Sequence, residues 1–128
     1  MRIAAVIARI LLGVMFFVFG LNGFLQFIPA PPPPGAAGVF VGALFSSHFY
    51  VLIFGTQLIA GILLLLNQFV PLALVLLAAV IANILVFHIT MQPSGLGPGL
   101  LAAILWVILA FRFWSHLAPL FTRRAAEG

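Results

Sequence analysis

The chain has 128 residues, of which 66% are hydrophobic and 5% are charged; soluble domains carry about 25% charged residues, so we expect a membrane protein. The net charge of +4 comes from five arginines, and no basic stretch interleaves with aromatic residues, which argues against a nucleic-acid partner. There is no cysteine and one carboxylate, Glu127. This inventory excludes disulfides, catalytic thiols and carboxylate pairs within one chain.

The first predicted membrane span covers about residues 8–28, and Arg2 and Arg9 stand at its start. A spanning helix needs about 20 apolar residues. The next residues, 29–38, read PAPPPPGAAG and predict a stiff polyproline spacer without helix. The apolar stretch 39–45 fits an interfacial or re-entrant piece, and Ser46 or Ser47 would cap the next helix.

Three further spans follow, at about residues 48–66, 71–91 and 99–117. The short link at 67–70 makes the second and third spans antiparallel neighbours, and PSGLGP at 93–98 breaks the chain before the fourth. We therefore predict an all-α fold: one transmembrane domain over residues 1–128, built as a four-helix bundle with a proline-rich outer first loop.

The arginines predict the topology. They precede the first span or lie at and beyond the end of the fourth, and the two loops expected outside hold neither Lys nor Arg. The positive-inside rule then places both termini in the cytoplasm, which agrees with an even number of spans. The residues concerned are Arg2, Arg9, Arg112, Arg123 and Arg124.

Five polar side chains fall in the outer half of the predicted spans, at spacings that let them converge between helices. They are Asn22, Gln26, Tyr50, Gln57 and Asn83. Two interpretations stay open: hydrogen bonds that hold helices together, or a polar pocket that opens outward to a quinone carbonyl, a lipid headgroup or a phenolic compound. Trp106, in the middle of the fourth span, needs a partner for its indole N–H.

The three histidines, His48, His88 and His116, could each ligate haem or a chlorophyll-type magnesium. One histidine per helix at a membrane boundary is more typical of a headgroup contact, and no two share a helix at ligand spacing. We therefore expect no metal site and neither haem nor pigment.

Three segments resemble the DoxX family: ARILLGVMFFVFGLNGFLQFIP (8–29), NQFVPLAL (67–74) and ANILVFHI (82–89). The resemblance implies a four-helix protein of the bacterial cytoplasmic (inner) membrane. Some members of that family are described as membrane subunits of thiosulfate:quinone oxidoreductase, and others are linked to thiol stress or to tolerance of catechols and quinones. Many members carry glutamate where Gln57 stands and histidine where Gln26 stands.

From these observations we expect a DoxX-like accessory subunit of a membrane redox or respiratory complex, non-catalytic or in contact with quinone or lipid. It would require no cofactor and would not be an enzyme on its own; its partners would be membrane lipids and other membrane subunits or further copies of itself. One alternative is a quinone- or catechol-linked oxidoreductase, which would need a bound cofactor. Another is a small-molecule transporter, which would have to be an oligomer because four helices seldom enclose a gated path.

Overall fold

The computed structural model describes residues 2–127, which form helices and no strand. The all-α prediction is confirmed to that extent. The elements in chain order are α1 (Arg2–Leu25), α2 (Gly35–Ser46), α3 (Tyr50–Leu66), α4 (Val70–Thr90), the 3₁₀ turn η1 (Pro93–Gly95), α5 (Leu96–Arg112), α6 (Trp114–Leu117) and the 3₁₀ turn η2 (Ala118–Phe121).

Several of these helices are long and apolar enough to cross a membrane. Arg2–Leu25, Val70–Thr90 and Pro93–Arg112 each meet this condition, and α2 with α3 would make a fourth span if the two, bent by 86°, are taken as one. With 17 residues, α3 alone is about 25 Å long, shorter than a hydrocarbon core of about 30 Å. The structure is compatible with a membrane protein.

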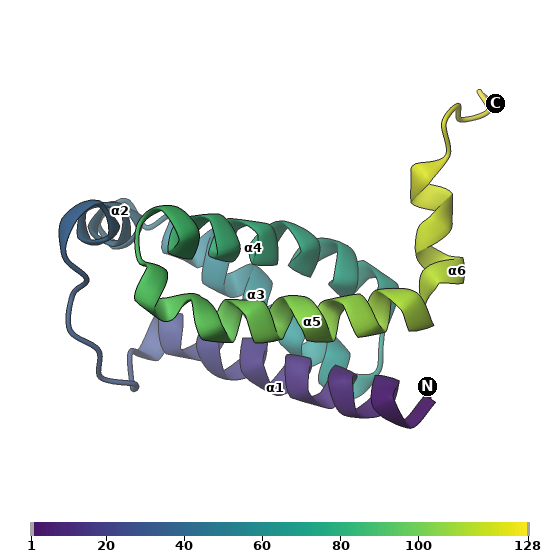
Figure 1. The fold of residues 1–128 in the computed structure, drawn as a ribbon, viewed down its shortest axis with the longest axis horizontal. Helices are drawn as coiled ribbons and strands as arrows, with labels where there is room; N and C mark the ends of the chain where they lie inside the picture. The colour runs from purple at the N-terminus through teal and green to yellow at the C-terminus, as the bar shows by residue number, and fades with distance from the viewer. Residues whose placement is uncertain (1, 128) are drawn as a thin grey trace.

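The long helices α1, α3, α4 and α5 lie side by side (Figure 1). α1 packs against α3 and α5, and α4 packs against the same two helices. Each long helix runs opposite to the one before it, so the N-terminus and the end of α5 lie at one end of the molecule (Figure 1). α2 lies across the opposite end.

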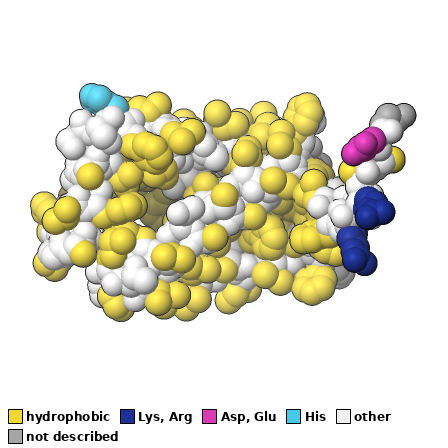
Figure 2. Space-filling model, turned by 90° about the horizontal axis from the view of Figure 1, so that it is seen from above, with side chains coloured by type: hydrophobic (Ala, Val, Ile, Leu, Met, Phe, Trp, Pro, Cys, Tyr) yellow, Lys and Arg dark blue, Asp and Glu magenta, His cyan; other side chains and the backbone are white. Residues whose placement is uncertain are grey.

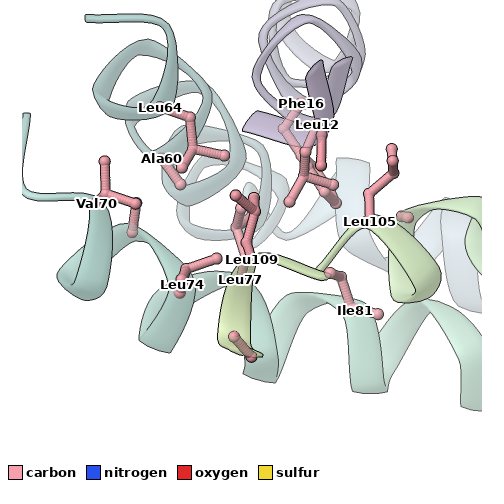
Figure 3. Packing of buried hydrophobic residues seen from close by; sticks show 14 of the residues in the cluster. Leu12, Phe16, Ala60, Leu64, Val70, Leu74, Leu77, Ile81, Leu105 and Leu109 are labelled. Atoms are coloured by element: carbon pink, nitrogen blue, oxygen red, sulfur yellow. The ribbon is translucent and has the colours of Figure 1, made fainter. Parts of the chain in front are cut away.

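Leucines dominate the core between these helices, as Figure 3 shows. Leu12, Leu64, Leu74, Leu77 and Leu109 have fully buried side chains. The outward faces are apolar as well, and hydrophobic side chains are spread along the whole length of the bundle on the face seen in Figure 2. A helix that is hydrophobic all round belongs in a large core or in a bilayer, and this chain is too small for a large core.

Glycines let α1 and α3 approach closely. A Cβ atom placed on Gly20 would lie 2.6 Å from the backbone nitrogen of Leu58, and one placed on Gly61 would lie 2.6 Å from that of Phe17. Backbone atoms cannot move aside as the tip of a side chain can. We call this contact, built on Gly20 and Gly61, the α1–α3 seam.

The proline-rich segment ends earlier than predicted. Pro34 is extended, with φ −78° and ψ 163°, but Gly35 to Gly38 form the first turn of α2, so the prediction of a helix-free spacer through residue 38 is wrong there. Gly35 has φ +67°, a left-handed conformation that glycine adopts at little cost. It turns the chain from the extended run into the helix.

The two serines cap a different helix end from the one predicted. The Ser47 hydroxyl donates to the Ala43 carbonyl at 2.6 Å and so serves the end of α2, and the Ser46 hydroxyl reaches the same oxygen at 3.4 Å. The N-cap of α3 is Phe49, without a side-chain hydrogen bond. A hydroxyl reaches the carbonyl one turn behind it while the chain is still helical, and α2 still is at Ser46.

Helix bounds also differ from the predicted spans. α1 begins at Arg2 because residues 3–7 are as apolar as the span itself, and it ends at Leu25, before Gln26 at φ +50°. α5 begins at Leu96 and ends at Arg112, since the chain turns at Phe113. The predicted fourth span, 99–117, therefore joins two elements that point in different directions.

Candidate functional site

Gln57 is the one buried polar side chain among residues 2–127, with 4% of its surface exposed. It shares a buried stripe of α3 with Ala60 and Leu64, which face the apolar core. Its amide makes no hydrogen bond with another described residue. Within the same residues no side-chain nitrogen or oxygen is both fully inaccessible and unpaired, so the amide keeps a small accessible surface.

Tyr50 stands two turns before Gln57 on α3, inside a group of aromatic rings. Its ring stacks on Phe45 of α2 at a centroid distance of 4.9 Å and meets Phe24 of α1 edge-on at 5.8 Å. Phe45 lies 6.1 Å from Phe54, one turn further along α3. These four residues, Phe24, Phe45, Tyr50 and Phe54, are called the Tyr50 group below; they join three helices at the end where α2 lies.

The hydrogen bonds of the other amides are local. The Asn22 side-chain oxygen accepts the backbone N–H of Ile28 at 2.8 Å, and the Asn83 amide donates to the Ala79 carbonyl of its own helix at 2.8 Å. Gln26 and Asn83 are exposed. Interhelical hydrogen bonds were one of the two open interpretations; Asn22 and Asn83 instead bond locally, because a short amide reaches a carbonyl or N–H of its own segment without ordering a second helix.

Of the five predicted site residues, Gln57 is buried and Tyr50 is half-buried, and the two lie two turns apart on α3. Periodicity placed them on one stripe because seven residues make almost two full turns. Phe45 belongs to the Tyr50 group too, and no sequence pattern pointed to it, since it lies on a different helix whose direction depends on the 86° bend. The rings of the Tyr50 group pack on one another, and Gln57 contributes a neutral amide without a partner among the described residues.

The histidines lie at three helix ends. His88 has its Nδ1 3.1 Å from the Gln92 carbonyl, at the turn that leads to α5. His48 stands at the bend between α2 and α3, with φ +64°, and His116 is exposed on α6. Residues 2–127 contain no group of three His, Cys, Asp or Glu side chains that could hold a metal ion.

Two side chains join helices through backbone carbonyls. The Trp106 indole N–H donates to Leu74 of α4 at 2.8 Å, which confirms that this residue finds a partner. The Arg9 guanidinium donates to the Leu64 carbonyl in the last turn of α3. A cation is favoured there because the partial negative charge of the helix dipole gathers at the C-terminus.

Shallow hollows open on the outer surface and are lined by apolar side chains. One lies between α4 and α5, where Ala78, Ala82 and Ala103 leave room beside Trp106. The other lies on α5, around Ile104. Neither includes Tyr50 or Gln57.

Comparison of the chain with protein-family models, with curated proteins and with solved structures finds no match. The resemblance to the DoxX family therefore stays a prediction from the three sequence segments.

Proposed function

We propose that this chain is an integral membrane protein of the bacterial cytoplasmic membrane that acts as an accessory subunit beside other membrane proteins, in a redox or respiratory complex. It crosses the bilayer four times, with α2 at the outer surface and both termini in the cytoplasm. The observation that carries the proposal is the apolar surface of the long helices on both their inward and outward faces. The charged ends support the orientation, since arginines flank α1 and α5 at one end.

The residue inventory supports a role beside partners. The spans contain no cysteine and no carboxylate, and the buried polar group is a neutral amide. Such groups bind and orient a molecule, but they neither accept electrons nor move protons at neutral pH. The redox setting comes from the DoxX-like segments.

The Tyr50 group and Gln57 are the proposed contact for a quinone or a lipid carbonyl. Gln57 is 4% exposed as a residue, and its amide, which keeps a small accessible surface, has no partner among residues 2–127; in hydrocarbon such a group costs up to about 1–3 kcal/mol. A carbonyl that accepts its N–H group removes that penalty. The aromatic rings beside it provide a flat apolar wall for a ring or an acyl chain.

Native purification in a mild detergent tests the accessory role. We expect the chain to migrate with other membrane proteins, and the co-purifying partners identify the complex. Migration as a lone monomer, with no associated protein, contradicts the proposal. An absorbance spectrum of the same sample, from the near-ultraviolet to the far-red, distinguishes the accessory role from the enzyme alternative. A haem- or flavin-dependent oxidoreductase is coloured, whereas an accessory subunit without a cofactor is not.

A further inference from the structure

The chain leaves the bundle sideways after α5. α5 ends at Arg112, Phe113 adopts φ −105° and ψ 22°, and α6 and η2 follow. Figure 1 shows this segment turning away from the axis of α5, at the end of the molecule where the N-terminus lies. If α5 crosses the membrane, as proposed above, residues 114–121 run along the membrane surface.

The two sides of this segment differ. Leu117 is 4% exposed and belongs to the core cluster, so its side of the segment faces the bundle. Trp114 lies three residues before Leu117 on α6, on a similar side of the helix, and Phe121 ends the 3₁₀ turn η2 that follows. Their rings pack together at 5.6 Å, yet they are 50% and 73% exposed. The apolar side therefore continues beyond the edge of the bundle, where the hydrocarbon would begin.

Positive charge gathers at the same end. Arg2 begins α1, Arg9 bonds to the last turn of α3, and Arg112 ends α5 with its guanidinium 5.8 Å from the Phe113 ring. Arg123 and Arg124 follow η2 after Thr122. Against these five cations the whole chain has one carboxylate, Glu127. In Figure 2 the dark-blue arginine side chains appear at this end of the visible face.

We propose that residues 114–124 form a binding site for anionic phospholipids of the leaflet on the arginine side. Trp114 and Phe121 enter the interface between headgroups and acyl chains, and Arg123 and Arg124 pair with the phosphates. Aromatic rings on one side of a helix with arginines beside them are the composition of segments that lie in a membrane interface. The occupant is an anionic lipid because the excess positive charge at this end attracts negatively charged groups. Lipid phosphates lie at the same depth as the aromatic rings.

The test uses the full chain, purified and reconstituted into vesicles of phosphatidylcholine alone or with phosphatidylglycerol added. Native mass spectrometry of the extracted protein measures the ratio of phosphatidylglycerol to phosphatidylcholine that it retains. A basic residue near the surface contributes to anionic-lipid binding by an amount that corresponds to about a fivefold change in affinity. We expect Arg124→Gln to lower the retained ratio about fivefold, and the double change with Arg123→Gln to lower it about 20- to 30-fold, by the same rule.

Arg2→Gln is the matched control, since it removes the same charge at the same end but from α1. We expect it to change the retained ratio less than Arg124→Gln does, because Arg2 lies outside the segment 114–124 that brings rings and arginines together. A second readout is the emission of Trp114 in a Trp106→Phe background, which lipids with brominated acyl chains should quench. Equal effects of Arg2→Gln and Arg124→Gln, or an emission that such lipids do not quench, would overturn the proposal. So would a dimer in detergent that shields Trp114 without any lipid.

Failure of this site is distinguishable from failure of the proposed function on which it rests. Flotation of the vesicles in a density gradient shows whether the chain is held in the membrane. A chain that floats with both kinds of vesicle but shows no preference for phosphatidylglycerol has the membrane placement and lacks the site. A chain that floats with neither kind contradicts the membrane placement itself.

Discussion

The contact between α1 and α3 and the contact between α4 and α5 hold neighbouring helices together by different means. In the α1–α3 seam, Gly20 and Gly61 bring backbone against backbone. Between α4 and α5, Gly99 meets side chains and not backbone, alanines line a shallow hollow on the outside, and the Trp106 N–H bonds to Leu74 of the facing helix. Lipid tails are as apolar as leucine, so helices in a bilayer associate through close packing and hydrogen bonds. Both pairs use the second, since Arg9 of α1 bonds to the Leu64 carbonyl of α3; they differ in the first, because the α1–α3 seam brings backbone against backbone.

The largest effect is expected from filling the α1–α3 seam. In Gly61→Ala the new Cβ would meet the Phe17 nitrogen at 2.6 Å and the Gly13 carbonyl oxygen at 3.0 Å, so the two helices must separate. We expect a loss of about 1–3 kcal/mol, measured as a lower Tm in detergent.

Gly55→Ala is the matched control on the same helix, because its new Cβ would meet only the tip of Phe24 at an ordinary 3.9 Å. Alanine is the better helix former by about 1 kcal/mol, so this variant should be as stable as the wild type or more stable. An equal loss of Tm in both variants would mean that the glycines of α3 serve something other than close approach.

A smaller effect is expected from the other pair of helices. Trp106→Phe keeps an aromatic ring and removes the donor to the Leu74 carbonyl. We expect the free energy of unfolding to fall by about 1 kcal/mol, the usual net contribution of such a hydrogen bond. Trp114→Phe, in which no interhelical hydrogen bond is lost, is the control and should leave Tm unchanged. If both variants have the wild-type Tm, the Trp106 bond does not stabilise the α4–α5 contact.

A substitution at Gln57 tests whether this residue stabilises the bundle or binds a ligand. Gln57→Leu replaces an unpartnered amide by an apolar side chain of similar size. We therefore expect the free energy of unfolding to stay the same or to rise by up to about 1 kcal/mol, with Tm unchanged or higher. Binding of a short-chain ubiquinone analogue, followed by quenching of Tyr50 and tryptophan emission, should be lost. A lower yield and a lower Tm with no change in binding would make Gln57 a structural residue.

The smallest effect is expected at Asn83, which is exposed and bonds to its own helix. Asn83→Leu should change stability by less than about 0.5 kcal/mol and should leave binding of the quinone analogue intact. This variant is therefore also the control for Gln57→Leu. A loss of binding in both would restore the wider polar pocket that the sequence suggested.

Prediction from sequence succeeded where one residue type or one period decides the outcome. The apolar runs predicted helices long enough to span a bilayer, and the mid-helix indole predicted a partner for Trp106. It failed where two chemically acceptable partners compete. Asn83 could bond across helices or to Ala79, and Ser47 could cap the next helix or the previous one; the nearer partner won in both cases.

Composition by itself determined that the chain is helical and apolar, because a segment without water must satisfy its backbone internally. The order of residues also places the arginines at or near the ends of the predicted spans. Only the tertiary structure decided that Phe45 of α2 would reach Tyr50, that Arg9 would bond to Leu64, and that the chain would turn sideways at Phe113. Each of these depends on the relative direction of two elements, and helical periodicity describes one helix at a time.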